Sequence, residues 1–463
     1  MFCRSLRSKA AKRVAIGGGI GYIWRTSKVL SSLLSVFRDE MTMGAKPNAI
    51  VAQSGGPTAV INSSACGVIQ EAMRSEKIGR VLGATNGILG VLKEELFDIS
   101  AESAATIEAL KQTPSAAIGS CRYKLKSLDE SRADYERILD VFKTHDIHYF
   151  FYAGGNDSMD TADKVNKLAA DTGYELVCIG VPKTIDNDLA CTDHCPGYGS
   201  VAKYVATSAM NAGRDTEAIY TTDTCSILEV MGRNAGWIAA ATGLAHRTPE
   251  DAPHLIYMPE AAFSFEKLIS DVKEVYENLG RVFIVVGEGL KDENGKYVTA
   301  ETSTLATDSF GHAQLGGVAD MLKGVIEKHV GIKTRWNKLG TNQRSAMHFA
   351  SLTDVNEAYM CGQAAVRAAM SGVNGKMVTL VRGDGGGYEC TTGLAELRDV
   401  ANGEKKVPRE FINDTGNGIT EAMKDYVRPL VQGEAPIETG ADGLPVYMRF
   451  ERKPLAKKLP QYK

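Results

Sequence analysis

LVCIGVPKTIDNDL, residues 176–189, is the stretch that decides how this chain is expected to fold. Its apolar half, Leu176–Val181, predicts a buried parallel strand that stops at Pro182, because proline cannot continue a central ladder. The polar half supplies a lysine, a threonine and two aspartates within six residues. Ligands bind at the carboxyl ends of strands in open parallel sheets, so this loop is expected to carry chemistry. One acid can take a proton while the other holds a divalent metal; the alternative is a polar loop with solvated charges.

Two further strands are each followed by glycines and a helix. Asn48–Gln53 leads into SGGPTAVIN, residues 54–62, and then into a helical pattern. His148–Ala153 leads into GGNDSMDT, residues 154–161, and a helix through Leu168. Backbone N–H groups that converge on such a turn favour anions, as does the helix dipole. Both loops therefore predict phosphate cradles, with a plain tight turn as the alternative.

The alternation of strand and helix continues along the chain. The further predicted strands are Ser226–Met231, His254–Met258, Arg281–Gly287 and Lys376–Arg382. Arg233 follows the first of them, where an arginine suits a clamp on a transferring phosphoryl group; an exposed arginine is the alternative. From about Asn402 the chain is turn-rich and charged, which predicts a peripheral extension. The alternation predicts an α/β protein with parallel sheets, one per domain, and a site in the cleft between the domains.

The composition limits the class of protein and its partners. With 463 residues, 44% of them hydrophobic and 24% charged, the chain is globular and long enough for two or more domains. A net charge of -3 favours neither nucleic acid nor an anionic membrane as a partner, and no apolar run of about 18 residues predicts a membrane span. Nine scattered cysteines favour reduced thiols inside a cell. Cys191, His194 and Cys195 lie close together, but three local ligands without a second pair favour a surface loop over a zinc site.

Residues 1–45 form a basic segment of their own. Met1–Arg38 contains eight Lys or Arg and no acid. Two interpretations stay open: a mitochondrial-type transit peptide, or an upstream extension with Met41 or Met43 as the start, which is favoured. The expected location is the cytoplasm, with a mitochondrion or another organelle as the alternative.

Together the motifs resemble the 6-phosphofructokinase family, over roughly residues 47–400. The most specific of them are TIDND at 184–188 and MGR at 231–233. The others are Ser54-Gly55-Gly56 with Asn62, Gly154-Gly155-Asn156-Asp157-Ser158, Gly287-Glu288, and Arg335 with Arg344. The resemblance implies two α/β/α domains with mainly parallel sheets and the active site in the cleft between them. It assigns residues 46–197 plus about 343–395 to the phosphoryl donor, and 198–342 plus about 396–463 to fructose 6-phosphate.

The resemblance also implies a role for individual residues. Asp186 would be the general base for the sugar's 1-hydroxyl, Asp188 would lie near Mg²⁺ and the reacting phosphate, and Arg233 would balance charge in the transition state. The implied donor-binding residues are Gly55, Gly155, Asn156, Ser158 and Arg122. The implied sugar-binding residues are Thr184, Asp186, Met231, Gly232, Arg233, Glu288, Arg335 and Arg344. The family builds its sites across subunit interfaces, which implies a homo-oligomer, a dimer or a tetramer, with one of the two late arginines serving a neighbouring site.

The chain departs from the family's pattern at three places. Asn156 stands where the family usually has a magnesium-binding aspartate, which puts direct metal ligation there in doubt. Thr341 lies nearest to the position of the histidine common between the late arginines. The arginine expected near Thr224 is absent, so sugar recognition is expected to differ in detail.

Two residues resemble the pyrophosphate-dependent branch of this family. ATP-using relatives have glycine at the positions of Asp157 and Lys183. The carboxylate of Asp157 would repel a third phosphate group, and Lys183 can balance the charge of a small donor as it leaves. The expected reaction is therefore a reversible, Mg²⁺-dependent transfer from pyrophosphate to fructose 6-phosphate. The alternatives are an ATP-dependent 6-phosphofructokinase, an enzyme of the NAD kinase type and a non-catalytic regulatory subunit; for the two residues themselves, the alternative is a helix cap and a solvated lysine.

Overall fold

The computed structural model describes residues 46–299, 317–401 and 403–462. Both β-sheets belong to one compact unit that begins at Pro47. The choice between a transit peptide and an upstream extension falls on residues 1–45, which lie outside the described residues. Within the described ranges, no helix is long and apolar enough to cross a membrane.

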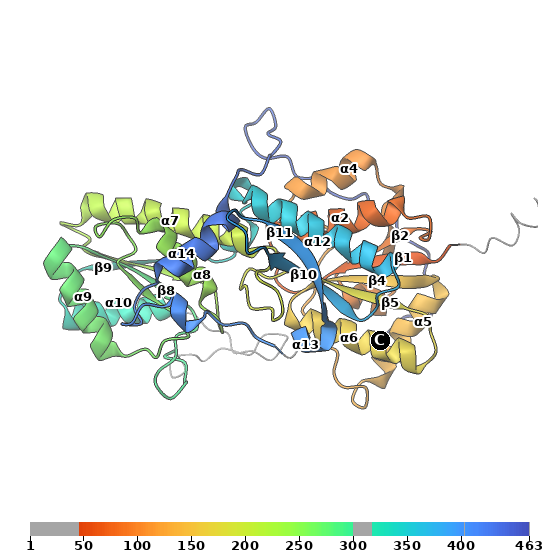
Figure 1. The fold of residues 1–463 in the computed structure, drawn as a ribbon, viewed down its shortest axis with the longest axis horizontal. Helices are drawn as coiled ribbons and strands as arrows, with labels where there is room; N and C mark the ends of the chain where they lie inside the picture. Colours follow the sequence, from red (N-terminus) through yellow and green to blue (C-terminus); the bar gives the residue numbers. More distant parts are fainter. Residues whose placement is uncertain (1–45, 300–316, 402, 463) are drawn as a thin grey trace, which may run out of the picture. The chain divides into compact units, whose positions relative to one another are not determined.

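The larger sheet has seven strands in the order β11-β10-β5-β4-β1-β2-β3 (Figure 1). They are β1 (Asn48–Gln53), β2 (Val81–Ala84), β3 (Leu96–Asp98), β4 (Ile147–Gly154), β5 (Val177–Pro182), β10 (Lys376–Arg382) and β11 (Cys390–Glu396). The inner strands are parallel, and the two edge strands run antiparallel to their neighbours. Along β1, Ile50 and Ala52 enter one core while Ala49 and Val51 enter the other, because successive side chains of a strand point to opposite faces.

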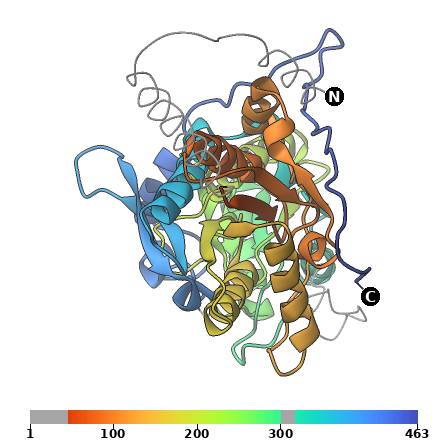
Figure 2. The same ribbon diagram turned by 90° about the vertical axis from the view of Figure 1, so that its right-hand side faces the viewer.

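Helices cover both faces of this sheet (Figures 1 and 2). α2 (Ile61–Arg74) and α12 (Leu352–Met370) pack side by side on one face. The other face carries α5 (Arg132–Thr144), α6 (Asn156–Asp171) and the short α13 (Leu397–Ala401). Shorter elements join the strands: α3 (Ile88–Leu92), α4 (Ala104–Glu108) and the 3₁₀ turns Ile99–Ala101 and Ala109–Gln112.

The smaller sheet has four parallel strands in the order β7-β8-β6-β9. They are β6 (Cys225–Val230), β7 (Leu255–Tyr257), β8 (Val282–Gly287) and β9 (Thr334–Lys338). One face packs on α7 (Tyr198–Ile219), α8 (Trp237–Ala241) and α14 (Glu421–Val427), and the other on α9 (Phe265–Leu279) and α10 (Val318–His329). The remaining elements are α11 (Asn342–Ser345) and the 3₁₀ turns Thr242–Ala245, Met347–Phe349, Arg409–Phe411 and Arg428–Val431.

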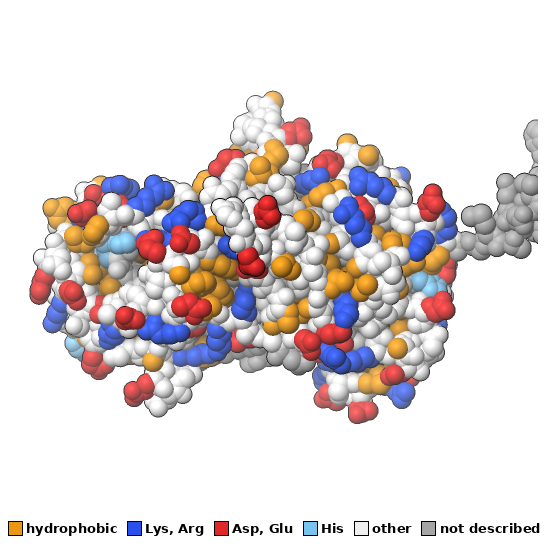
Figure 3. All heavy atoms as spheres, viewed as in Figure 1, with side chains coloured by type: hydrophobic (Ala, Val, Ile, Leu, Met, Phe, Trp, Pro, Cys, Tyr) orange, Lys and Arg blue, Asp and Glu red, His pale blue; other side chains and the backbone are white. Residues whose placement is uncertain are grey.

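The predicted α/β class with mainly parallel sheets is confirmed. All the strands predicted from the sequence begin and end within one residue of an observed strand. The boundaries of such strands are predictable from the sequence, because the strand begins with an apolar, β-branched run and ends where glycine or proline follows it. Charged side chains of both signs are interspersed over the face shown in Figure 3, in keeping with the small net charge.

The expectation that the chain is peripheral from about Asn402 is wrong. Val407, Ile412 and Met423 are buried in the core between the smaller sheet and α7. The last residues return to the larger sheet, where the rings of Phe450 and Phe97 lie 5.6 Å apart. The C-terminal residues described in the structure therefore contact both sheets.

The expectation of a surface loop around residues 191–195 is also wrong. Cys191 is exposed, but His194 and Cys195 are buried. The ring nitrogens of His194 are satisfied by Asp193, its neighbour in the chain, and by Glu357, 163 residues away, and sequence spacing does not show the second partner.

Candidate active site

Lys183 is the most unusual side chain in the loop after β5, because it is charged yet only 4% exposed. Its backbone N–H donates to Gly154 O at 3.1 Å, which aligns it beside the end of β4. Its Nζ donates to Gly56 O at 2.8 Å. Gly55 adopts a φ of +78°, and a Cβ added there would lie 3.1 Å from the same Nζ, so glycine is required for this approach. The lysine therefore lies against the glycine loop that follows β1.

The protonated form of Lys183 is less favourable here than in water, because the side chain is buried. Burial lowers its pKa to about 8, and the nearby Arg122 and Arg344 act in the same direction. Asp186 and Asp188 oppose the change. The ammonium group is therefore cationic at neutral pH, within reach of two carboxylates and close to losing its proton.

Asp186 lies in the turn two residues after Thr184, whose hydroxyl accepts the Asp186 N–H at 3.0 Å. Burial raises the pKa of Asp186 to about 6, and the carboxylate of Glu288 raises it further. The cations Lys183, Arg233 and Arg344 oppose this rise. A carboxylate with a pKa just below neutrality is ionised at pH 7 and still basic enough to accept a proton in a reaction.

Asp188 lies beyond a residue in an uncommon conformation. Asn187, between the two acids, is fully buried at φ +54°, a left-handed conformation that asparagine tolerates better than most residues. Burial raises the pKa of Asp188 to about 7, and Asp186 adds to the rise. The carbonyl of Asp188 accepts the backbone N–H of Lys405 at 2.8 Å. The two acids therefore share one polar turn, and neither is a freely solvated charge.

The glycine loop after β4 supplies the donor-side candidates. Gly155 is the N-cap of α6, and Asn156 and Asp157 are its first residues. The Oδ1 of Asn156 is buried and has no hydrogen-bond partner among the described residues. Asp157 forms an ion pair with Lys124 at 3.2 Å rather than capping the helix, and Ser158 is buried beneath the loop. The alternative of a capping Asp157 and a solvated Lys183 does not describe this structure.

The smaller sheet contributes the loops after β6 and β8, which carry Met231-Gly232-Arg233 and Glu288. The backbone N–H of Glu288 donates to Val230 O at 3.1 Å, and a Cβ at Gly289 would lie 1.7 Å from Arg233 O. These loops therefore pack backbone against backbone. Burial raises the pKa of Glu288, while Lys338 and Arg233 oppose the rise.

Arg344, on α11, reaches the glycine loop of the larger sheet. A Cβ at Gly56 would lie 2.8 Å from its guanidinium and 3.9 Å from that of Arg122. Burial and the charge of Arg122 lower the pKa of Arg344. Two guanidinium groups crowded against a glycine turn suit a ligand that carries several negative charges.

Arg335 is not brought to this centre. It lies on β9, is exposed, and forms an ion pair with Asp223. In the parallel pair of β6 and β9, Arg335 stands opposite Ser226 near the amino end of β6, whereas Arg233 follows the carboxyl end. The structure thus separates the two late arginines.

Sequence reasoning missed several residues of this centre. Gln343 accepts the Met231 N–H at 3.2 Å, Lys338 pairs with the fully buried Glu229 at 2.7 Å, and Glu404 acts on the pKa of Asp188. None carries a local motif. The one available signal was that Lys338 and Gln343 lie in sequence between Arg335 and Arg344.

A buried lysine, two aspartates in one turn and arginines from three loops and helices around them define a phosphoryl-transfer class of protein. The chain belongs to the phosphofructokinase family: the family described as "Phosphofructokinase" matches residues 48–369. It is similar to the pyrophosphate--fructose 6-phosphate 1-phosphotransferase of Xanthomonas campestris pv. campestris, with 51% identity over 416 residues that cover 90% of this chain and 99% of that protein. The protein of the same name from Halomonas elongata is 48% identical over 423 residues, covering 90% and 100%. A solved structure of pyrophosphate-dependent phosphofructokinase from Marinobacter aquaeolei covers 90% of this chain and 99% of its own, with a TM-score of 0.81 and 45% identity.

Proposed function

We propose that this chain transfers a phosphoryl group from pyrophosphate to the 1-hydroxyl of fructose 6-phosphate, giving fructose 1,6-bisphosphate and phosphate. The observation that carries the proposal is the buried Lys183, held at 2.8 Å from Gly56 O beside Asp186 and Asp188. The names of the relatives with 48% and 51% identity support the same substrates.

The choice of pyrophosphate over ATP rests on the shape and charge of the donor side. A cation at Lys183 can stay close to a compact donor and balance the charge of the departing phosphate. Asp157 carries its negative charge at the start of α6, where a longer polyphosphate would meet repulsion. Pyrophosphate and the sugar phosphate ester have similar group-transfer potential, so the reaction runs in both directions.

The proton is taken by Asp186. The oxygen of the 1-hydroxyl attacks one phosphorus of pyrophosphate, the hydroxyl proton passes to Asp186, and the P–O–P bridge breaks to release phosphate. Burial and Glu288 bring the pKa of Asp186 to about 6, where it can perform this role at neutral pH. Arg233 lies close enough to affect that pKa and balances the charge that develops on the transferring group.

The residues of the turn fit a divalent cation. Asn156 offers a buried Oδ1 that has no hydrogen-bond partner in the part of the chain that the structure describes. Burial beside Asp186 raises the pKa of Asp188 to about 7, so that a cation would stabilise its ionised form. We assign Mg²⁺ to Asn156 and Asp188. When bound, Mg²⁺ neutralises charge on the phosphoryl oxygens.

The donor and the sugar phosphate divide between the two sheets. We assign pyrophosphate to the larger sheet, through Gly55, Gly155, Asn156, Ser158 and Arg122. We assign fructose 6-phosphate to Thr184, Met231, Gly232, Arg233, Glu288 and Arg344. The exposed Arg335 serves the site of a neighbouring subunit, so the protein acts as a homo-oligomer, either a dimer or a tetramer. We place the enzyme in the cytoplasm.

The deciding experiment is donor kinetics on the wild type and on the double variant Asp157→Gly/Lys183→Gly. The wild type should use pyrophosphate and hardly use ATP, and the double variant should lose pyrophosphate activity and gain some ATP activity. Turnover by the wild type with ATP alone would refute the donor but leave the sugar chemistry standing. No turnover with either donor would favour a regulatory subunit.

The neighbouring-subunit role of Arg335 has its own test. Arg335→Ala and Asp186→Ser are each expected to be inactive, and mixing them under conditions that exchange subunits should restore part of the activity. A mixed oligomer contains sites with both native residues only if Arg335 acts on its neighbour. Absence of any recovery, with exchange verified, would mean that Arg335 does not act on a neighbouring site, and an Arg335→Ala variant that stays active would show that it has no role in catalysis.

A further inference from the structure

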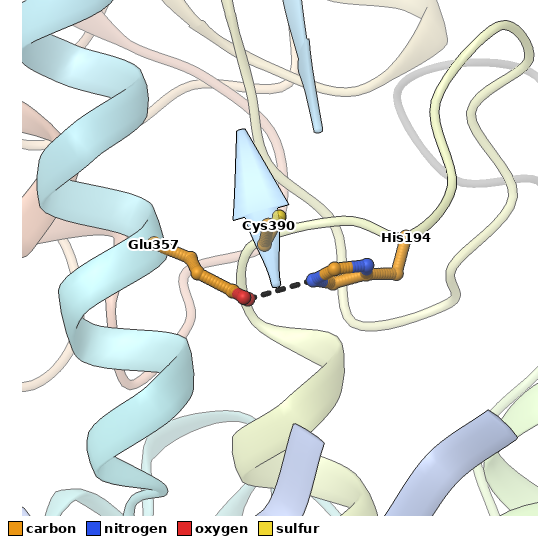
Figure 4. A group of neighbouring side chains, drawn as sticks. All are labelled: His194, Glu357 and Cys390. Carbon is orange, nitrogen blue, oxygen red and sulfur yellow. Dashed lines mark hydrogen bonds and ion pairs between the residues drawn. The ribbon is translucent and has the colours of Figure 1, made fainter. Parts of the chain in front are cut away.

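A buried histidine lies near the catalytic turn without a role in the proposed reaction. His194 is 1% exposed, and its two ring nitrogens lie 2.7 Å from carboxylate oxygens of Asp193 and Glu357. Figure 4 shows the arrangement: His194 projects from the loop, Glu357 from α12, and Cys390 lies beside them at the start of β11. The cluster thus joins the loop that follows the catalytic turn to a helix 163 residues away in sequence.

The geometry requires a doubly protonated ring. A neutral imidazole has one N–H and one lone pair, so one of the two carboxylates would face a lone pair at hydrogen-bond distance. Each carboxylate also contacts a further donor, Asp193 the guanidinium of Arg382 at 3.1 Å and Glu357 the hydroxyl of Tyr388. Burial would lower the pKa of His194, but the hydrogen bonds that its ring donates to Asp193 and Glu357 outweigh this effect and raise the pKa.

A metal ion would need different spacing. His194, Glu357 and Cys390 offer ligand atoms within 4.8 Å of one another. Nitrogen and oxygen ligands about 2.0 Å from a tetrahedral zinc lie roughly 3.3 Å apart. The 2.7 Å between His194 Nε2 and Glu357 Oε2 is instead the length of a charge-assisted hydrogen bond.

The cluster is linked to the turn between the two aspartates. The side chain of Asn187, the residue in the left-handed conformation, accepts the Cys195 N–H at 2.9 Å and donates to the Tyr426 hydroxyl at 2.9 Å. That hydroxyl in turn donates to Asp193 O at 2.7 Å. Asp193 and Cys195, on either side of His194, therefore hold Asn187 in place through hydrogen bonds. Asn187 lies between Asp186 and Asp188, so its conformation orients both carboxylates.

We propose that the imidazolium of His194 is a positioning residue, which clamps the loop between Asp193 and Glu357 and so keeps Asn187 in the conformation that orients Asp186 and Asp188. This role rests on the proposed function, since it concerns the rate of that reaction. Besides the two carboxylates, the charged or titratable groups that face the cluster from neighbouring elements are Arg382, Tyr388, Cys390, Lys405 and Tyr426. A displacement of about 1 Å in a catalytic group can cost on the order of 100-fold in rate.

The test compares His194→Gln with a matched variant at a second buried pair. His145 and Glu94 are both 1% exposed and also 2.7 Å apart, but they lie outside the catalytic turn. His194→Gln should lower kcat with pyrophosphate by about 10- to 100-fold and change KM for fructose 6-phosphate little. His145→Gln should lose thermal stability while keeping kcat within about threefold. Equal kcat for both variants, whether retained or lost, would overturn the proposal.

The double variant His194→Gln/Glu357→Gln distinguishes the loss of the ion pair from a general disturbance of the fold. Removing the cation alone leaves a buried carboxylate without its partner, so also removing that carboxylate's charge should restore part of kcat. A double variant no faster than His194→Gln would contradict the clamp. If His194→Gln is insoluble, Tyr388→Phe replaces it, with a smaller but definite loss of kcat expected; an unchanged kcat counts against the proposal.

Two measurements on the wild-type protein complete the test. With ¹⁵N-labelled histidine, the His194 ring should show two protonated nitrogens at neutral pH, and a neutral ring would overturn the clamp. The protonation of the His194 ring tests the clamp independently of the enzyme's activity. If the wild type does not use pyrophosphate, the proposed function is refuted, but the clamp is still tested by this measurement. Cys390→Ser should leave kcat unchanged; one zinc per chain in the wild type, lost in this variant, would replace the clamp by a metal site.

Discussion

Replacing the buried lysine by an apolar side chain of similar length should make the protein more stable and less active at once. In the folded protein the pKa of Lys183 is about 8, against 10.5 for a free lysine. Since each pKa unit corresponds to about 1.4 kcal/mol, keeping this lysine charged costs the fold about 3 kcal/mol. Lys183→Met removes that cost but leaves Gly56 O without its donor, a loss of about 1–2 kcal/mol. The variant should therefore gain about 1–2 kcal/mol at pH 7.

The sign of the effect follows from linkage. The folded-state pKa is depressed, so the cost is fully present below about pH 8 and disappears as the pH rises towards 10.5. The gain in Tm of Lys183→Met over the wild type should accordingly be a few degrees at pH 7 and should shrink above pH 8. Activity with pyrophosphate should fall by at least about 100-fold, because the charge that balances the leaving phosphate is gone.

Lys203→Met is the matched control for this prediction. Lys203 is also buried and its Nζ also donates to a backbone carbonyl, Gly433 O at 2.7 Å, but it lies on α7 away from the catalytic turn. This control should lose stability and keep its activity. Thermal unfolding and steady-state kinetics of the three proteins at pH 7 and pH 9 check the reasoning. A Lys183→Met protein that melts below the wild type at pH 7, or that retains pyrophosphate turnover, would refute it.

Four further outcomes are expected. Asp186→Ser should lower kcat by about 10²- to 10⁴-fold with KM for fructose 6-phosphate little changed, and more than half of the activity remaining would remove Asp186 as the base. In the wild type, kcat/KM for pyrophosphate should fall as the pH rises through about 8, where Lys183 loses its proton, and a flat profile from pH 7 to pH 9 would argue against a catalytic lysine. A chain that starts at Met43 should be soluble and as active as the full chain in the same assay, since no site residue precedes it; failure to fold would mean that the segment packs on the body. Deleting Lys457–Lys463 should lower the free energy of unfolding by about 2–4 kcal/mol in urea titrations, because the buried Glu94 loses two backbone N–H donors, and an unchanged midpoint would contradict this account.

The fold was predictable where local pattern and burial coincide. The predicted strands Leu176–Val181 and Lys376–Arg382 match β5 (Val177–Pro182) and β10 of the larger sheet, because both are largely apolar runs of strand length. β9 escaped prediction because Thr334–Lys338 is an edge strand with four exposed residues, so its sequence lacks an apolar signal. Val407 and Ile412 enter the core singly, and the seven-residue helix that carries Met423 buries only one other residue, Val427, which is too short a pattern to predict.

The site was predictable as far as short motifs reach. Lys183, Asp186 and Asp188 stand together in one loop, Arg233 was predicted from its place after a strand, and Glu288 and Arg344 were candidates by resemblance. The contact between Arg344 and the glycine loop, however, joins residues almost 290 positions apart. The burial of His194 likewise depends on Glu357, 163 residues away. Tertiary partners of this kind set the pKa values of a site and leave no trace in sequence spacing.

The order of the strands has a consequence for how the protein is made. β5 ends at Pro182, and its neighbour β10, which pairs with it through Ile179 and Gly180, begins only at Lys376. A ribosome adds about 5–20 residues per second, so roughly 10–40 s separate the two strands, while the whole smaller sheet is being synthesised. During that interval the apolar β5 presents unpaired N–H and C=O groups to any other nascent strand nearby. Expression conditions that slow translation after residue 182 should therefore increase aggregation of incomplete chains, whereas the finished enzyme has this edge covered.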